Sequence, residues 1–246
     1  MSTHDHRTRD PATTGQIVLG GLGMGAVAVA SHLLPALSIY WPMLRRQLDV
    51  ECATSSGRGY ALTFDDGPHP RGTPAVLEIL AAAEVRATFF LVGEQVRRDP
   101  ALAQEIVAAG HEVGLHCDRH RNLLRLAPWQ VSADIARAQE TIEAATGRAI
   151  GLYRPPYGAL SASALRVARA HGWRTLLWSQ WGKDWQAKAT PESIATRVTD
   201  GAAEGSVLLL HDADDYSAQG SWQRTAAALP RVLETLAERG LRPVAP

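Results

Sequence analysis

The chain has 246 residues, of which 46% are hydrophobic and 20% are charged, and 25 lysine and arginine residues balance 25 aspartate and glutamate residues. Nucleic-acid binding is driven by cations that neutralise phosphates, so a chain without net charge is not expected to have nucleic acid as its main partner. The composition excludes a wholly disordered chain, and two cysteines are too few for a disulfide framework or a four-cysteine zinc site.

The N-terminal region is apolar and differs from the rest of the chain. Residues 17–37 supply the roughly 20 apolar residues that a membrane-spanning helix requires. Tyr40 and Trp41 follow, in the position where aromatic residues commonly anchor a helix at the membrane interface, and Arg45 and Arg46 come next. This order of residues predicts a membrane anchor.

Two other interpretations of the apolar region stay open. Residues 28–30 (Ala-Val-Ala) resemble the cleavage site of a secretory signal, and a hairpin packed on the main domain would also bury these side chains. We therefore assign residues 1–50 to an anchor or signal region, residues 51–59 to a polar linker, and residues 60–246 to the main domain.

From residue 60 onward, short apolar runs alternate with helical patterns. Strands are expected at residues 60–64, 87–92, 112–115, 152–154, 174–178, 207–210 and 241–244, and helices at residues 73–83, 100–109, 128–146, 161–171, 191–203 and 223–239. About seven such β–α units predict an α/β fold whose parallel sheet closes, or nearly closes, into an irregular barrel.

Polar side chains follow these strands at the points where the strands end. They are Asp65, Asp66, His116, Arg154, Asp184 and His211. The carboxyl ends of parallel strands meet on one face of a barrel, so we expect these side chains to converge there. This coincidence of polarity and strand end predicts an active site.

His116 and His120 indicate a metal site. On one helical turn, imidazoles four residues apart point the same way and can bind one cation, and a carboxylate from Asp65 or Asp66 would complete a catalytic zinc site with an open position for water. The metal would lower the pKa of this water toward ~7, and the other aspartate would accept its proton as general base. His211 is the candidate general acid.

Five motifs, in the same order, resemble those of the polysaccharide deacetylase family, also described as the NodB homology domain and as carbohydrate esterase family 4. The matching segments are residues 63–68 (Thr-Phe-Asp-Asp-Gly-Pro), 116–120 (His-Cys-Asp-Arg-His), 154–158 (Arg-Pro-Pro-Tyr-Gly), 184–185 (Asp-Trp) and 208–211 (Leu-Leu-Leu-His). The resemblance extends over residues 60–244. It implies an irregular (β/α) barrel and a metal-dependent hydrolase that removes acetyl groups from sugars.

The resemblance also implies a role for each matching polar residue. Asp65 corresponds to the catalytic base and Arg154 to the residue that steadies it. His211 corresponds to the acid, and Asp184 to the carboxylate that tunes this acid. The implied metal ligands are Asp66, His116 and His120. The usual metal is Zn²⁺, with Co²⁺, Ni²⁺ or Mn²⁺ as alternatives.

A second set of residues is expected to contact the substrate. In the family, the backbone amide of the residue that matches Tyr157 helps to stabilise the oxyanion, and the leucines before the acid form an apolar pocket for the acyl methyl group. The expected residues are Pro156, Tyr157, Trp181, Trp185, Leu209 and Trp222. The tryptophans can stack on sugar faces or belong to the core, and for Trp178 we expect the core.

Two positions depart from the family pattern. Cys117 stands where the family usually has serine or threonine, which donates stronger hydrogen bonds than a thiol. Trp181 stands where the fourth motif usually starts with aspartate. This change removes an acid from the neighbourhood of Arg154 and places an apolar ring beside Trp178 and Trp185. Because the base, the acid and the metal ligands are retained, we predict that activity is retained and that the groove is altered.

The leading functional hypothesis is removal of N-acetyl, or alternatively O-acetyl, groups from a cell-envelope glycan such as peptidoglycan or a chitin-like oligomer. The expected partners are this glycan and a membrane, and the catalytic domain is expected outside the cytoplasm at the cell membrane or in the envelope. One alternative is a deacylase of a lipid-linked sugar. Another is a catalytically silent module that binds envelope glycans through its tryptophans. The oligomeric state is left open.

Overall fold

The computed structural model describes residues 30–246. The predicted anchor or signal falls mostly on residues 17–29, which lie outside the described residues. Within residues 30–246, no helix combines the length and the hydropathy that crossing a membrane requires. The described part begins with helical residues 30–33, the 3-10 helix η1 (Leu34–Ile39) and the helix α2 (Pro42–Gln47).

The domain is built on one curled sheet of eight strands, in the order β1-β6-β5-β4-β3-β2-β8-β7. Every pairing between neighbouring strands is parallel. The strands are β1 (Val50–Glu51), β2 (Tyr60–Asp65), β3 (Thr88–Val92), β4 (Glu112–Cys117), β5 (Leu152–Tyr153), β6 (Arg174–Leu176), β7 (Gln180–Trp181) and β8 (Ser206–His211). Because the edge strands β1 and β7 do not pair with each other, the barrel is open on one side.

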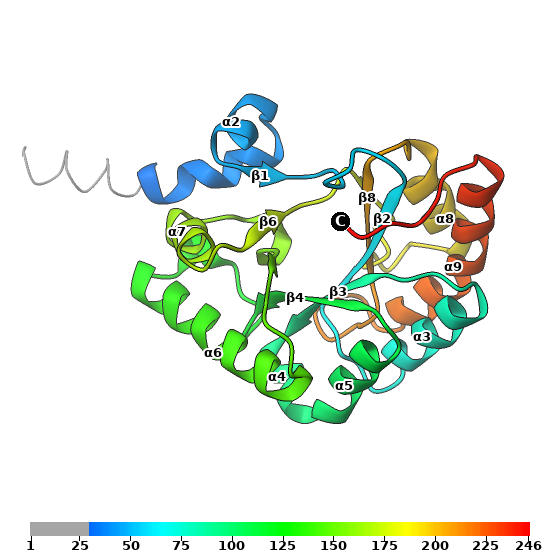
Figure 1. Cartoon of the computed structure of the whole chain (residues 1–246), viewed down its shortest axis with the longest axis horizontal. Helices are drawn as coiled ribbons and strands as arrows, with labels where there is room; N and C mark the ends of the chain where they lie inside the picture. Colours follow the sequence, from blue (N-terminus) through cyan, green and yellow to red (C-terminus); the bar gives the residue numbers. More distant parts are fainter. Residues whose placement is uncertain (1–29) are drawn as a thin grey trace, which may run out of the picture.

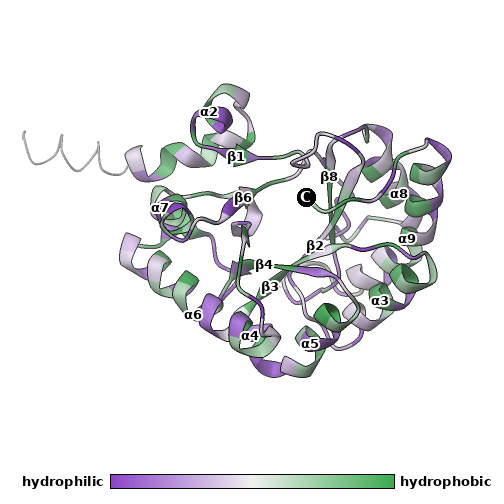
Figure 2. Cartoon of the chain, viewed as in Figure 1, coloured by the Kyte–Doolittle hydropathy of each residue, from purple (hydrophilic) through white to green (hydrophobic). Residues whose placement is uncertain are grey.

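Helices surround the outside of this sheet (Figure 1). They are α3 (Gly72–Ala82), α4 (Gly93–Arg98), α5 (Pro100–Ala108), α6 (Pro128–Thr146), α7 (Ala162–Ala170), α8 (Pro191–Asp200) and α9 (Ser221–Glu238), with the short 3-10 helices η2 (Leu123–Arg125) and η3 (Pro156–Gly158) in the loops. Hydrophobic and hydrophilic residues alternate along these helices (Figure 2), as expected when one face of each helix packs on the sheet and the other faces solvent.

The central strands are buried on both faces. All six residues of β2 and all five residues of β3 are buried. Near-continuous apolar runs are typical of parallel strands that are covered on one side by helices and on the other by the barrel interior. The predicted α/β fold with a parallel sheet curled into an irregular barrel is therefore confirmed.

Some element boundaries differ from the prediction. The strands β1 and β7 have two residues each, too few for a periodic pattern, and were not expected. The helix α4 directly follows β3 and precedes the predicted helix α5. The strand expected at residues 241–244 is reduced to one bridge between Tyr60 and Pro243, made by hydrogen bonds of Tyr60 with the Arg242 oxygen and the Val244 N–H.

Candidate functional site

The carboxyl ends of the strands surround a cavity of about 230 Å³. Most of the predicted site residues line it: Asp65, Asp66, His116, His120, Tyr157, Trp181, Trp185, Leu209 and His211. Asp65 and His211 are paired in register at the ends of the neighbouring strands β2 and β8. The expectation that polar strand ends converge is thus met by the geometry.

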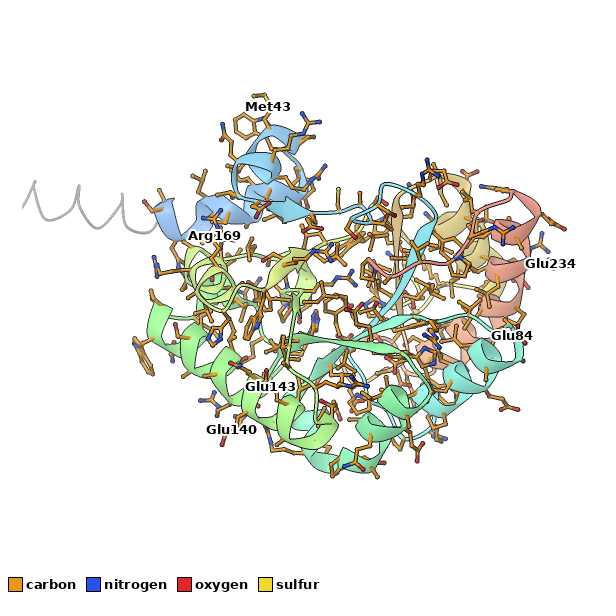
Figure 3. All side chains as sticks on the ribbon, in the orientation of Figure 1. Met43, Glu84, Glu140, Glu143, Arg169 and Glu234 are labelled. Atoms are coloured by element: carbon orange, nitrogen blue, oxygen red, sulfur yellow. The ribbon has the colours of Figure 1, made fainter. Side chains whose placement is uncertain are left out.

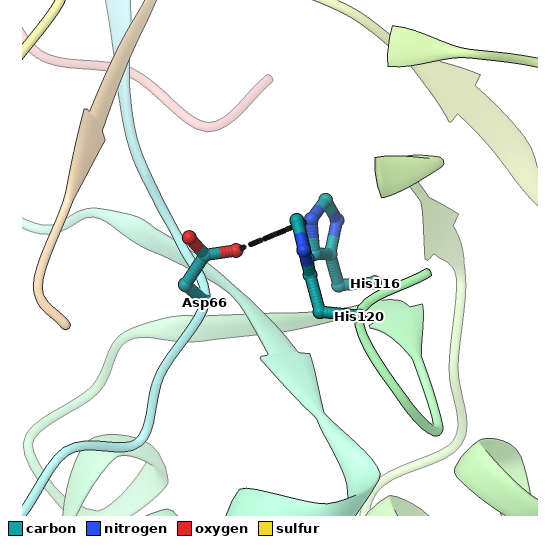
Figure 4. Close-up of side chains that lie close together, drawn as sticks. All are labelled: Asp66, His116 and His120. Atoms are coloured by element: carbon teal, nitrogen blue, oxygen red, sulfur yellow. Dashed lines mark ion pairs between the residues drawn. The ribbon is translucent and has the colours of Figure 1, made fainter. Parts of the chain in front are cut away.

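Three of these side chains form a candidate metal site (Figure 4). The Asp66 Oδ1 atom lies 3.3 Å from the His120 Nε2 atom and 3.5 Å from the His116 Nε2 atom. A tetrahedral zinc ion with bonds of about 2.0–2.1 Å holds its ligand atoms about 3.3 Å apart. The Asp66 Oδ1 atom is buried and has no hydrogen-bond partner among residues 30–246. The three donors therefore fit a shared divalent ion.

The two histidines do not lie on a helical turn, so this part of the prediction was wrong. His116 belongs to the strand β4, and His120 lies in the loop that follows it. The loop is held in place by the buried Asp134, which accepts hydrogen bonds from the Asp118 backbone N–H and from the Arg121 guanidinium. A bend after a strand, rather than helical spacing, brings the imidazoles together.

The histidines are prepared to act as neutral ligands. The His116 Nδ1–H donates a hydrogen bond to the backbone oxygen of Arg154 at 2.8 Å, which leaves the Nε2 lone pair for the cavity. Burial lowers the pKa of both His116 and His120 to about 3. Burial also raises the pKa of Asp66 to about 7. A divalent cation between these groups would favour the ionised carboxylate and the neutral imidazoles.

Asp65 lines the same cavity and is paired with Arg154. The Arg154 Nη1 atom donates to Asp65 Oδ1 at 2.7 Å and to Thr63 Oγ1 at 2.8 Å. The remaining donors reach the backbone oxygens of Leu176 and Leu177. Arg154 is fully buried and well supplied with acceptors. Although Trp181 stands where the family usually has an aspartate, Arg154 still has the carboxylate of Asp65 as a partner and further backbone and hydroxyl acceptors.

His211 is held by Asp184 through both of its carboxylate oxygens. The His211 Nδ1–H donates to Asp184 Oδ1 at 2.9 Å, and the His211 backbone N–H and the Thr225 hydroxyl donate to Asp184 Oδ2. Burial acts to lower the pKa of His211, but the carboxylates of Asp184, Asp66 and Asp65, Asp184 first among them, together outweigh it and raise this pKa to about 10. The His211 Nε2 atom, 4.0 Å from Asp66 Oδ2, thus carries a proton near neutral pH.

Three tryptophan side chains that line the cavity form a row. The rings of Trp178, Trp181 and Trp185 follow one another at centroid distances of 5.9 and 5.3 Å, and Trp185 is 5.4 Å from His211. Trp178, expected in the core, packs on the core and also lines the cavity. This row of rings gives an apolar surface suited to the face of a sugar or to an acyl group.

Two residues that we expected near the substrate do not line this cavity. Trp222 lies on α9 and packs against His69, with ring centroids 5.7 Å apart. Pro156 is buried at the start of η3 and positions Tyr157, whose φ of 60° is in the left-handed region. The Tyr157 side chain is 59% exposed at the cavity rim.

Tyr216 and Ser217 line the cavity but were not identified from the sequence. The Tyr216 ring stacks on His120 at 4.5 Å, and its hydroxyl donates a hydrogen bond to Glu94 Oε1 at 2.6 Å. The only signal in the sequence was an aromatic residue in an otherwise polar loop shortly after His211. No spacing rule connects this loop to His120.

Comparison with known proteins identifies the family. The sequence profile described as Polysaccharide deacetylase matches residues 53–176. A chitooligosaccharide deacetylase of Azorhizobium caulinodans is 38% identical over 186 residues, which cover 73% of this chain and 88% of that protein. A peptidoglycan-N-acetylglucosamine deacetylase of Bacillus cereus is 35% identical over 184 residues, which cover 74% of this chain and 83% of that protein.

A solved structure agrees with this result. The family 4 carbohydrate esterase from Streptomyces lividans, in complex with acetate, superposes with a TM-score of 0.68 and 34% identity, covering 76% of this chain and 92% of that one. Profile, relatives and fold lead to the same family that the five motifs resemble. The chain belongs to the polysaccharide deacetylase family, carbohydrate esterase family 4.

Proposed function

We propose that this protein hydrolyses N-acetyl groups on N-acetylglucosamine units of an envelope glycan such as peptidoglycan or a chitin-like oligomer. The observation that carries the proposal is the arrangement of three groups in one cavity: the Asp66, His116 and His120 triad, the buried Asp65–Arg154 pair, and the His211–Asp184 pair. The names of the two relatives support this substrate class.

The triad Asp66, His116 and His120 would hold the metal, and we propose Zn²⁺ because two imidazoles and one carboxylate are typical catalytic zinc ligands. Such an ion, when bound, lowers the pKa of water and polarises the acyl carbonyl. All three residues line the cavity, so an ion held by them would be accessible to water and substrate there.

The remaining residues supply the proton transfers. Asp65, oriented by Arg154, accepts a proton from the attacking water. The His211 Nε2–H donates a proton to the departing amine as the carbon–nitrogen bond breaks, which releases acetate and a free amino sugar. The backbone amide of Tyr157 stabilises the oxyanion, and Leu209 with the tryptophans surrounds the acetyl methyl group.

Acetate release tests this proposal. Zn²⁺-loaded protein should release acetate from chitin oligomers or peptidoglycan fragments, and metal-stripped protein should not. Asp65→Asn should lower turnover roughly 100- to 10,000-fold while its metal content, measured by elemental analysis, stays unchanged. His116→Ala should lose the metal itself. Glycan binding without acetate release under any divalent metal would instead favour a silent binding module, and release from O-acetylated glycans alone would favour an esterase.

A lipid-linked sugar is the second candidate substrate. Ile39 belongs to the apolar N-terminal segment, and its terminal methyl lies 3.0 Å from the point where a Cβ atom on Gly158 would be. Gly158 directly follows the cavity residue Tyr157. Because the proposed glycan belongs to the cell envelope and the N-terminal segment is apolar, we also propose that the domain works outside the cytoplasm, close to the membrane. Rates on soluble and lipid-linked N-acetylated oligosaccharides, compared with the full chain in the same detergent, distinguish the two substrates.

A further inference from the structure

The N-terminal segment carries a concentration of exposed apolar side chains. Of the nine large hydrophobic side chains exposed among residues 30–246, six lie within residues 33–43. They are Leu33, Leu34, Leu37, Tyr40, Trp41 and Met43, and we call them the docking face. Tyr40 is 84% exposed, Met43 66% and Trp41 57%. Concentrated exposure of this kind marks an interaction surface rather than ordinary surface composition.

The docking face is held in a fixed orientation by its opposite side. Pro35 and Ser38 are fully or nearly buried, and Ile39 packs against Gly158. The His32 ring lies 3.5 Å from the Ser163 hydroxyl on α7. Figure 3 places Met43 at the outer tip of the segment, directed away from the barrel. The apolar side chains are therefore presented outward by a supported element.

The charges around the docking face are cationic. The sequence contains no aspartate or glutamate between Asp10 and Asp49, whereas Arg45 and Arg46 directly follow the face. Beside it, a hollow of about 340 Å³ combines an apolar lining that includes Leu34 with Arg166 and Arg169 from α7. Tryptophan and tyrosine next to arginine are typical of the headgroup level of a bilayer, and the arginines complement anionic lipid.

We propose that the docking face binds the surface of an anionic lipid bilayer, with Tyr40, Trp41 and Met43 at the level of the headgroups. The 34 residues from 11 to 44 carry no lysine, arginine, aspartate or glutamate, so the sequence that leads into the face is compatible with the same environment. This inference concerns binding only and does not depend on the deacetylase activity, so its failure and the failure of the proposed function are separable.

A fluorescent label on the docking face reports whether this face enters a lipid bilayer. In the full chain carrying Cys52→Ser, which leaves only the buried Cys117, an environment-sensitive label is attached through Met43→Cys. The matched control is Trp129→Cys, because Trp129 is 72% exposed but lies on α6. Leu37→Cys provides a second position on the face if Met43→Cys does not fold, as checked by circular dichroism.

With vesicles of phosphatidylcholine and phosphatidylglycerol, the emission of the label at position 43 should shift to shorter wavelength and be quenched by brominated acyl chains, whereas the label at position 129 should not respond. Arg45→Gln and Arg46→Gln should each weaken this response about fivefold at a given content of anionic lipid. Equal responses at positions 43 and 129 would overturn the proposal.

Two further outcomes would also overturn it. If the label at position 43 is already shielded without vesicles and the protein is monomeric by analytical ultracentrifugation, another segment of the chain covers the face. If the label is shielded and the protein is dimeric, the occupant is a second copy of the chain.

Discussion

At the scale of single residues, the position of Asp65 depends on how Arg154 is held. The Arg154 guanidinium is fully buried, donates to two backbone oxygens from the end of β6 and beyond, and lies 4.0 Å over the Phe90 ring. These contacts fix the orientation of the guanidinium plane independently of its contact with the Asp65 carboxylate. A lysine could not reproduce them, because its ammonium is a single point donor.

Asp184 sets the proton affinity of His211, which predicts a change in the pH dependence of activity. Asp184→Asn removes a charge that raises the pKa of His211. His211 should then lose its proton at a lower pH, and the decrease in rate on the alkaline side of the profile should begin at a lower pH. The alkaline limb should move down by roughly one to three pH units. The pH–rate profile on a soluble oligosaccharide measures this shift.

Thr225→Val is the matched control for Asp184→Asn. It deletes one hydrogen bond to Asp184 but keeps the carboxylate, so the alkaline limb should stay nearly where it is. An unchanged limb in Asp184→Asn, or equal shifts in both variants, would contradict the role given to this charge.

Tyr216 should influence metal affinity through His120. Tyr216→Ala removes the ring stacked on His120 and should weaken zinc binding roughly tenfold, as is usual when a partner of a metal ligand is lost. Tyr216→Phe keeps the ring and loses only the hydrogen bonds of the hydroxyl, to Glu94 and from Gln95, so its affinity should stay close to that of the wild type. Competition with a fluorescent zinc chelator measures both affinities, and equal weakening by the two variants would show that stacking is not the cause.

At the scale of elements, the start of α3 packs directly against the end of β8. A Cβ atom added at Gly72 would overlap the backbone oxygen of Asp212, the residue after His211. The Thr73 hydroxyl donates a short hydrogen bond to the Asp212 carboxylate at the same place. The position of His211 is therefore coupled to the packing of the first helix after Asp65 and Asp66.

Gly72→Ala should consequently cost both stability and activity. The overlap forces backbone movement, so we expect a loss of about 3 kcal/mol in the free energy of unfolding and reduced turnover. Gly147→Ala is the control, because Gly147 has a φ of 64° but no atom within 4 Å of its Cβ position. It should cost about 1 kcal/mol and leave turnover unchanged. Urea unfolding and acetate release test both, and full activity in Gly72→Ala would contradict the coupling.

The same scale shows what the sequence could and could not predict. Longer strands such as β2 and β8 were found because apolar runs ended in polar residues, and this pattern also located Asp65, His116 and His211. The bend that brings His120 to His116 depends on Asp134, which is distant in sequence, so local spacing gave the wrong geometry. Tyr216 was missed because its contact with His120 exists only after two separate loops fold together.

At the scale of the whole molecule, buried histidines link stability to pH. Burial, with a contribution from Arg86, lowers the pKa of His111 below its ordinary value of 6.5. Below about pH 6.5, His111 is protonated in the unfolded chain but remains neutral in the folded chain. The free energy of unfolding therefore decreases as the pH falls below about 6.5. His111 also accepts the Ala87 backbone N–H through Nδ1, a bond that needs the unprotonated nitrogen.

His111→Asn should flatten this dependence, because the Asn oxygen can accept the same N–H but does not titrate in this range. The free energy of unfolding, measured in urea at about pH 7.5 and about pH 5.5, should change less in the variant than in the wild type. Identical changes in the two proteins would rule out His111 as a contributor.

The pairing of β2 with β8 also has a consequence for biosynthesis. The strand with His211 begins at residue 206 and lies beside the strand that ends in Asp65, so two parts of the candidate site that are far apart in the sequence are synthesised at different times. A nascent chain can already contain the triad and Asp65 while His211 has not yet left the ribosome. We therefore expect no hydrolysis before β8 has been synthesised, and we expect fragments that stop before residue 206 to be inert however well their early strands fold.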